Sequence, residues 1–185
     1  MIIGVTGIIG SGKSEAARLL ARRFAAEHIE VDAVGHQTLA ENKFVRCGLR
    51  LFFGSTERRD IAAQVFKSPL KLWLLNALTH PFMRRIIRRR IRAPRKHEGI
   101  IPRHFVIDAA LLYQMGLAKY CDKVLFVDAP ENLLYERLTA RGLTAGQVWR
   151  RLAANQKVYI YKKHAYKVII NDGSLAALQK NIENF

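Results

Sequence analysis

The chain has 185 residues, of which 31 are lysine or arginine and 15 are aspartate or glutamate, so its formal net charge is +16. This length fits one domain of roughly 100 to 200 residues and excludes two full domains. Half of the residues are hydrophobic, which supplies a sizeable core and excludes an intrinsically disordered chain. The basic excess favours a polyanionic partner, which composition alone leaves open between nucleic acid, anionic lipid and phosphate-bearing substrates.

The sequence carries no mark of secretion or of a membrane span. Cys47 and Cys121 stand far apart, which indicates free thiols in a reducing compartment. The uncharged segment Met1–Gly12 lacks the basic start and the small-residue cleavage site of a signal peptide. No charge-free apolar run approaches the roughly 18 residues of a transmembrane helix. We therefore expect a cytoplasmic protein.

Short apolar runs predict β-strands, and helical patterns alternate with them. The strands are expected at Met1–Thr6, Ile29–Asp32, His104–Asp108, Lys123–Asp128 and Lys167–Ile170. The helices are expected at Lys13–Ala26, about Asp60–Arg95, Glu131–Arg141, about Thr144–Lys163 and Leu175–Asn184. Nearly continuous apolar strands are typical of a parallel sheet that is buried on both faces. The predicted class is therefore α/β, a three-layer parallel sheet with helices on both faces.

The second and third expected strands are separated by about 70 residues of helix-like sequence, far more than a simple crossover requires. We expect a helical insertion at about 36–100 within a single domain, 1–185. Pro81 is expected to divide its long helical stretch in two, because proline lacks a backbone donor and clashes with the preceding turn. A stripe of apolar residues is expected to face the core: Leu74, Leu78, Phe82 and Ile86.

The strongest local signal is the segment Gly7–Ser14, which reads GIIGSGKS and fits G-x-x-x-x-G-K-[ST] at each fixed position. An expected strand precedes it and an expected helix follows it, as the motif requires. Glycines allow backbone N–H groups to turn inward around a phosphate, and the helix N-terminus adds unpaired donors. Lys13 is expected to reach the β- and γ-phosphates, and the Ser14 hydroxyl is expected to bind Mg²⁺. A nucleoside triphosphate site of the P-loop type is therefore predicted, the alternative being a glycine-rich turn that binds nothing.

A phosphate loop alone does not separate kinases from GTPases or ATPases. The guanine-recognition pattern N-K-x-D is absent from the sequence, which argues against a GTPase. The run Phe105–Asp108 is similar to a strand ending in a Walker B acid. Asp108 is therefore a candidate metal-binding residue, although an aspartate at a strand end often only forms a turn.

From end to end, the chain resembles the dephospho-coenzyme A kinase family, which shares the P-loop nucleoside triphosphate hydrolase fold. The matching fragments, in chain order, are Thr6–Ser14, Val31–Val34, Thr56–Arg58 before Val65 and Phe66, Leu75–Pro81, Ala110–Gln114, Arg137 with Arg141 and Gln156, and Ile169–Ser174. Val34 stands where the family has the second acid of Asp-Ala-Asp, and Ala110 and Gln114 stand where it has Pro and Glu; Tyr166 stands where it often has Asp. These departures leave the triphosphate motif intact and concern elements that the family uses around its acceptor.

The resemblance implies ATP-dependent phosphorylation of the ribose 3′-hydroxyl of dephospho-coenzyme A, with Mg²⁺ as cofactor. It implies a lid at about 137–156, and Arg137 and Arg141, four residues apart, would lie on one helix face and reach the phosphates on closure. Asp32 would orient or deprotonate the acceptor hydroxyl, or would cap a helix beginning near Ala33. His80 would contact the substrate, or would cap a helix beginning at Pro81.

The implied site residues form four sets. The catalytic residues are Lys13, Asp32 and Arg141; the nucleotide-binding residues are Gly7, Ile9, Gly10, Ser11, Gly12, Lys13, Ser14, Arg137, Asn171 and Gly173; the substrate-binding residues are Asp32, Arg58, His80 and Leu111; and the metal-binding residues are Ser14 and Asp108. Asn171 and Gly173 would close the adenine side of the nucleotide site.

A basic segment, Arg84–Lys96, has no such assignment, and no acid occurs between Asp60 and Glu98. Arginines that repel one another along a helix would be relieved by a bound polyanion: the diphosphate of the acceptor, RNA or a membrane surface. A solvated helix face is the plain alternative, and the lack of interleaved aromatic residues argues against single-stranded nucleic acid. Two other functions remain open, a related kinase with another nucleoside or nucleotide acceptor and an ATP-binding regulator that contacts RNA.

Overall fold

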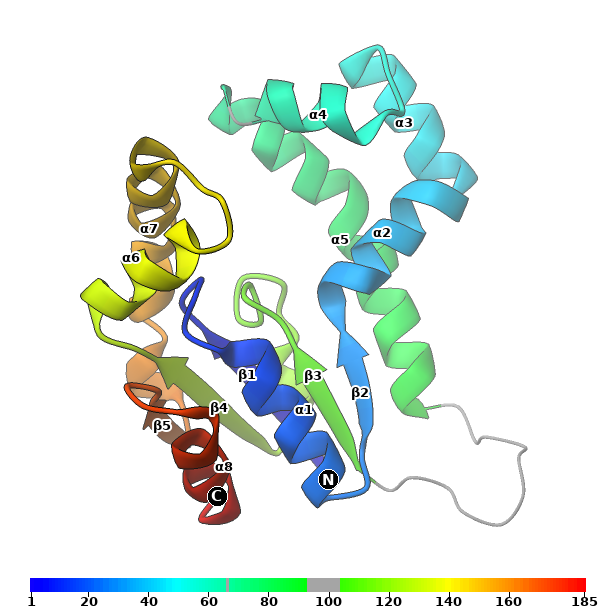
Figure 1. Ribbon diagram of the computed structural model, residues 1–185. Helices are drawn as coiled ribbons and strands as arrows, with labels where there is room; N and C mark the ends of the chain where they lie inside the picture. The colour runs from blue at the N-terminus through cyan, green and yellow to red at the C-terminus, as the bar shows by residue number, and fades with distance from the viewer. Residues whose placement is uncertain (66, 93–103) are drawn as a thin grey trace. The chain divides into compact units, whose positions relative to one another are not determined.

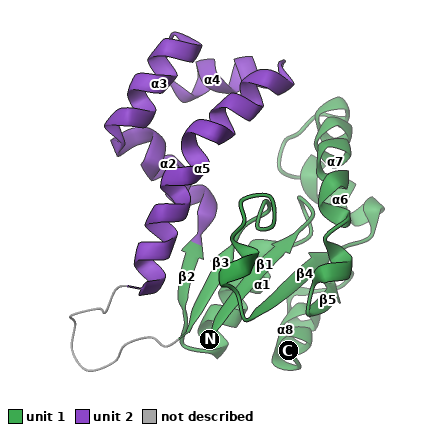
Figure 2. Ribbon diagram, turned by 180° about the vertical axis from the view of Figure 1, so that it is seen from behind, with its two compact units in different colours: residues 1–29, 96–185 green, residues 30–95 purple. Residues whose placement is uncertain are grey.

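The computed structural model describes residues 1–65, 67–92 and 104–185 (Figure 1). The chain divides into two compact units, one made of residues 1–29 and 96–185 and the other of residues 30–95 (Figure 2). The second unit begins at Glu30, earlier than the expected start of the insertion near residue 36. The expected end of the insertion, residues 93–100, lies outside the described residues. Below, unit 1 denotes the first part and unit 2 the second.

Unit 1 is built on a parallel sheet in the order β2-β3-β1-β4-β5. Its strands are β1 (Ile2–Gly7), β2 (Glu27–Glu30), β3 (Phe105–Asp108), β4 (Lys123–Asp128) and β5 (Lys167–Ile170). In the register, Val5 of β1 lies between Asp108 of β3 and Leu125 of β4. Parallel strands that run side by side end at the same edge, so the segments that follow β1, β3 and β4 emerge together. The predicted α/β class is confirmed.

Helices cover this sheet on both faces, which makes the three layers. They are α1 (Lys13–Arg23), α6 (Glu131–Thr139), α7 (Ala145–Tyr159) and α8 (Leu175–Glu183). The alternation along β4 separates two cores: Leu125 and Val127 pack with residues of α1 and α8, whereas Phe126 packs with residues of α6 and α7. Successive side chains of a strand point to opposite faces, so each core covers one face.

Unit 2 is helical. It contains α2 (Val31–Glu41), α3 (Lys43–Phe53), α4 (Arg58–Val65) and α5 (Pro69–Arg92). The core of this unit is formed by Val45, Leu49, Phe53 and Ile61, against which the expected stripe residues Leu74, Leu78 and Phe82 pack. Helices α3 and α5 approach closely, since a Cβ on Gly48 would lie 2.8 Å from a methyl group of Leu78. The buried residues of α5, however, lie on the neighbouring line of the helix: Thr79, Met83 and Ile87.

The expected break at Pro81 is wrong, because α5 continues through it from Pro69 to Arg92. Pro81 is exposed, so its ring lies on the outer side of the helix and displaces no core residue. Phe82 and Met83 beside it are packed into the unit. Tertiary packing on either side of a proline can outweigh the backbone hydrogen bond that it removes. Within the described ranges, no helix combines the length and apolar character needed to cross a membrane.

Candidate functional site

The phosphate loop joins β1 to α1 and has the backbone that its glycines predict. Gly10 and Gly12 have φ angles of +85° and +87°, in the left-handed region that side chains other than glycine rarely adopt. At Gly12 a Cβ would also overlap the side-chain amide of Asn171. Glycine is therefore required by backbone conformation at both positions, and at Gly12 also by the lack of space for a Cβ.

The loop presents polar groups that the protein itself does not use. Helix α1 begins at Lys13, and its N-cap, Gly12, provides no side-chain cap, so the first-turn N–H groups remain available to an anion. The hydroxyl of Ser11 is buried and has no hydrogen-bond partner among the described residues. Buried polar atoms without partners are rare. Together these features fit a loop that closes around phosphate oxygens.

Lys13 and Asp108 form an ion pair that joins the loop to the end of β3. The ammonium group of Lys13 also lies 3.5 Å from the hydroxyl of Ser14, and the imidazole of His28 on β2 lies 3.8 Å from the second carboxylate oxygen of Asp108. Asp108 is only 4% exposed. Burial raises the pKa of Asp108, but the interactions with His28, Lys13 and Ser14 outweigh it and hold that pKa below its ordinary value. The carboxylate is therefore ionised at neutral pH.

The oxygen atoms of Ser14 and Asp108 suit a hard cation such as Mg²⁺. In the described part of the chain, no group of three or more His, Cys, Asp or Glu residues could hold a metal by itself. Mg²⁺ in nucleotide sites usually has one or two protein ligands and shares the rest with phosphates and water. The residues present thus fit a metal that binds together with the nucleotide.

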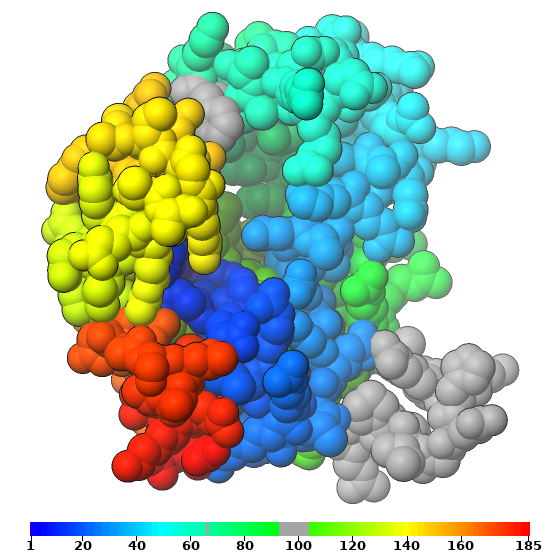
Figure 3. Space-filling model, in the orientation of Figure 1, coloured from blue at the N-terminus to red at the C-terminus, as the bar shows by residue number. Residues whose placement is uncertain are grey.

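Arg137 and Asn171, which are expected to bind the nucleotide, donate hydrogen bonds to backbone carbonyls of the loop and of its surroundings. The guanidinium of Arg137 donates to the carbonyl oxygens of Gly10 and Asn171, at 3.4 and 3.1 Å. The side-chain amide of Asn171 donates to the carbonyl oxygen of Ser11 at 2.7 Å. Figure 3 shows the surface of α6 and the residues after it (yellow) against the N-terminal segment (blue). The two side chains clamp the loop from α6 and from the end of β5, a link that no local sequence pattern reveals.

The expectation that Arg141 and Arg137 lie on one helix face is wrong. Helix α6 ends at Thr139, and the chain leaves it through Gly142 at a φ of +82°. The N–H groups of Gly142 and Leu143 donate to the carbonyls of Thr139 and Leu138, a Schellman-type ending. Arg141 therefore lies in an exposed turn, and its guanidinium has no ion-pair partner among the described residues.

The position of Asp32 in the secondary structure differs from the position that the sequence predicts. Strand β2 ends at Glu30 and α2 begins at Val31, so Asp32 belongs to the first turn of the helix and neither ends the strand nor caps the helix. An exposed carboxylate in a first helical turn is stabilised by the helix dipole. Val34, by contrast, is 1% exposed, so this departure from the family pattern places an apolar side chain in the interior.

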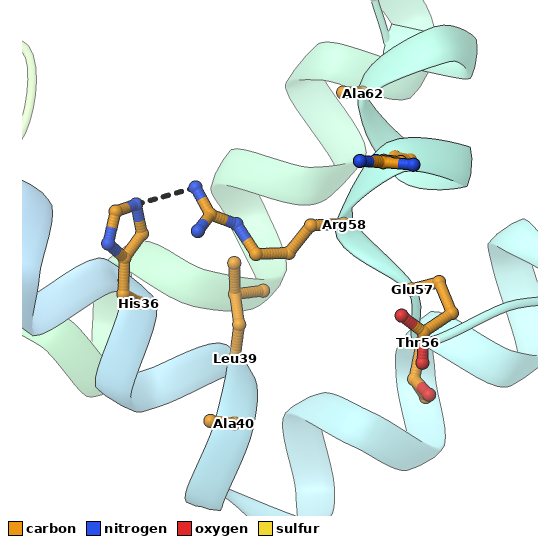
Figure 4. Close-up of a pocket in the computed structure, with 8 residues that line it drawn as sticks. His36, Leu39, Ala40, Thr56, Glu57, Arg58 and Ala62 are labelled. Carbon is orange, nitrogen blue, oxygen red and sulfur yellow. Dashed lines mark hydrogen bonds between the residues drawn. The ribbon is translucent and has the colours of Figure 1, made fainter.

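Arg58 is the first residue of α4 and lines a cavity of about 770 Å³ in unit 2 (Figure 4). The cavity is lined by His36, Leu39, Ala40, Thr56, Glu57, Arg58, Arg59 and Ala62. Arg58 donates a hydrogen bond of 2.8 Å to the Nε2 atom of His36, so that imidazole nitrogen acts as an acceptor. His36 was not anticipated, because nothing in the sequence relates it to a residue so far along the chain.

The remaining expected residues are distributed over both units. His80 lies inside α5 and caps no helix; burial and the nearby Arg84 lower its pKa, which favours the neutral imidazole. Leu111 is exposed in the turns after β3, and Gly173 is exposed in the loop after β5. Ile9, within the phosphate loop, is half-buried and packs against the core formed with α6 and α7.

Comparison with known proteins identifies the family of this chain. The family model described as dephospho-CoA kinase matches residues 1–177. The dephospho-CoA kinase of Chlorobaculum tepidum is 32% identical over 99% of this chain and 92% of its own length. That of Bacillus licheniformis is 36% identical over 95% of this chain and 90% of its own length.

Solved structures are also similar to this chain. A crystal structure of a Thermus thermophilus protein superimposes with a TM-score of 0.77 at 30% identity, covering 100% of this chain and 95% of that one. The dephospho-CoA kinase of Campylobacter jejuni, at 21% identity and a TM-score of 0.60, covers 99% of this chain and 94% of its own and shares the fold. The resemblance in the motifs is thereby confirmed, and this chain belongs to the dephospho-CoA kinase family.

Proposed function

We propose that this protein transfers the γ-phosphoryl group of ATP to the ribose 3′-hydroxyl of dephospho-coenzyme A. Membership of a kinase family implies the use of ATP. The observation that carries the proposal is the phosphate loop, with unused N–H donors and Lys13 and Ser14 beside an ionised Asp108. Phosphoryl transfer needs mainly in-line positioning and cationic compensation of the phosphate oxygens, which these groups can supply.

Lys13 exchanges partners in this mechanism. The ammonium group of Lys13 pairs with Asp108, which compensates the charge of a poorly exposed carboxylate. When ATP binds, Lys13 turns to the β- and γ-phosphate oxygens, as the lysine of this motif does. Ser14 and Asp108 are then the residues that would hold Mg²⁺, which neutralises phosphate charge when bound.

Arg141 and Asp32 are proposed to have separate roles, Arg141 toward the phosphoryl oxygens and Asp32 toward the acceptor hydroxyl. Arg141, exposed and without an ion-pair partner in the described residues, can approach the phosphoryl oxygens when the segment around 137–156 closes. Arg137 is better suited to positioning the loop, since its guanidinium is already bonded to backbone carbonyls. Asp32 orients the acceptor hydroxyl and accepts its proton.

The acceptor is proposed to contact unit 2 through the cavity beside Arg58. Arg58 and Arg59 bring two guanidinium groups to a wall that also contains Leu39, Ala40 and Ala62. A molecule that combines a diphosphate with a less polar arm, as dephospho-coenzyme A does, fits such a mixed lining. His80 and Leu111 remain expected contacts of the acceptor.

The test is to incubate the pure protein with Mg-ATP and dephospho-coenzyme A and to measure coenzyme A by mass spectrometry. Coenzyme A is expected from the wild type, none above background from Lys13→Ala, and the wild-type amount from Lys163→Ala, which removes an exposed lysine. Faster phosphorylation of another nucleoside or nucleotide would replace the proposed acceptor. Undiminished product from Lys13→Ala would refute the assigned site.

A further inference from the structure

Helix α5 carries an outward face whose character changes along its length. Seven of its exposed residues lie three or four positions apart and so form one stripe: Leu70, Trp73, Ala77, Pro81, Arg85, Arg88 and Arg92. The first half of the stripe is apolar and the second half is basic. None of these residues has a role in the phosphoryl transfer proposed above, and the stripe is named the α5 face below.

The large apolar side chains in the first half of the α5 face are more exposed than is usual for a surface in contact with water alone. Leu70 and Trp73 are 72% and 64% exposed. Helix α3 of the same unit, which packs on α5 through Gly48 and Leu78, also exposes large apolar side chains, with Phe44 at 78% and Leu51 at 75%. Large apolar side chains that gather on one helical unit usually mark an interaction site.

The basic half lacks internal compensation. Helix α5 contains no acidic residue, and none of its arginines forms an ion pair within the described residues. Among the described residues, Arg90 is the one arginine of α5 with a side-chain hydrogen bond, which it donates to the neutral amide of Gln37 at 3.2 Å. Arg88 and Arg92 stand one turn apart with like charge, which costs stability unless an anion lies between them. The residues of the basic segment Arg84–Lys96 that follow Arg92 lie outside the described residues.

We propose that the α5 face binds the surface of an anionic phospholipid bilayer. Tryptophan and leucine side chains partition into the interfacial region, and arginines are attracted to anionic headgroups. RNA fits less well, because stacking requires aromatic residues among the cations, and Trp73 lies twelve positions, roughly 18 Å of helix, before Arg85. This proposal is independent of the acceptor assignment, since it involves no residue of the phosphate loop or the cavity.

The first experiment is co-sedimentation with vesicles of phosphatidylcholine alone or mixed with phosphatidylglycerol. Binding is expected only with phosphatidylglycerol and is expected to weaken as salt increases. Each arginine contributes roughly a fivefold gain in affinity, so the triple variant R85Q/R88Q/R92Q should bind at least tenfold more weakly. The variant R85K/R88K/R92K should retain most of the binding because it keeps the charge.

The matched control is R22Q/R150Q/R151Q, which removes three exposed arginines from unit 1 and should bind vesicles like the wild type. Equal loss in both triple variants would overturn the proposal in favour of a general effect of net charge. Kinase activity of R85Q/R88Q/R92Q should equal that of the wild type, which also shows that the variant folds.

The second experiment reports on the apolar half without altering it. The chain has two tryptophans, so Trp149→Phe leaves Trp73 as the sole reporter. Its fluorescence should shift to the blue with phosphatidylglycerol vesicles and should be quenched by brominated acyl chains. Absence of vesicle binding by the wild type, an unchanged Trp73 spectrum in bound protein, or binding to RNA but not to vesicles would each overturn the proposal.

Discussion

The phosphate loop of unit 1 and the arginines of unit 2 differ in how their charged groups are partnered. Around the phosphate loop, Lys13 is paired to Asp108, and Arg137 and Asn171 donate to loop carbonyls. In unit 2 most arginines are exposed and lack ion pairs among the described residues, and Arg58 is held only by a neutral imidazole. We infer from this difference that the side chains around the phosphate loop are preorganised by contacts within unit 1, whereas the charges of unit 2 are available to other molecules.

The largest expected effect is that of Lys13→Ala. This substitution removes the cation that compensates the γ-phosphoryl group, and the loss of one such group costs on the order of 10³ in kcat. Steady-state kinetics with dephospho-coenzyme A measures the effect, and Lys163→Ala is the control. A loss smaller than tenfold would contradict the assignment of Lys13.

Asn171→Ala tests whether the donor side is preorganised. Without the bond from the side-chain amide to the Ser11 carbonyl, the loop loses one of its clamps, and small misplacements of reacting groups cost up to about 100-fold. We expect a weaker affinity for ATP and a lower kcat, both by about tenfold or more, with no change in the KM for the acceptor. Asn155→Ala, on α7, serves as the control, and wild-type kinetics for Asn171→Ala would show that the loop needs no clamp.

Arg58→Gln tests the availability of charge in unit 2. Loss of a charge-assisted hydrogen bond to a phosphate weakens binding by about 2 kcal/mol, or roughly tenfold to 30-fold. The KM for dephospho-coenzyme A should rise by this factor while the KM for ATP stays the same. Arg46→Gln, an exposed arginine of α3 outside the cavity, is the matched control. A rise in the KM for ATP instead would contradict the proposal that Arg58 binds the acceptor.

The smallest expected effect concerns stability at acid pH. The folded pKa of Asp108 lies below the ordinary value of 3.8, so ionised Asp108 stabilises the fold at pH values above 3.8, and this contribution is lost as the pH falls through the folded pKa. The free energy of unfolding of the wild type should therefore fall more steeply below pH 4 than that of Asp108→Asn. Urea titrations between pH 3 and pH 6 measure the free energy of unfolding of both proteins. Parallel pH dependences would mean that the partners of Asp108 do not stabilise its ionised form.

Local patterns predicted much of unit 1. Strands β4 and β5 occupy the expected residues, and the phosphate loop has the expected strand before it and helix after it, because apolar runs and glycine spacing are decided by neighbouring residues. Unit 2 was less predictable. Helices α2 and α3 were not assigned individually, and the continuity of α5 through Pro81 depends on packing by residues of α2, α3 and α4.

By itself, the sequence determined the class of fold, the phosphate loop and the family, since each depends on residues that are close in the chain or in fixed order along it. The tertiary structure alone decided that Asn171 and Arg137 clamp the loop, that His36 meets Arg58 and that Arg141 stands outside its helix. These contacts join distant segments, or depend on how a helix ends in three dimensions, and no local pattern carries that information. It also decided that the arginines of α5 remain without ion pairs in the described residues. Part of the excess positive charge of the chain is thereby assigned to a defined surface.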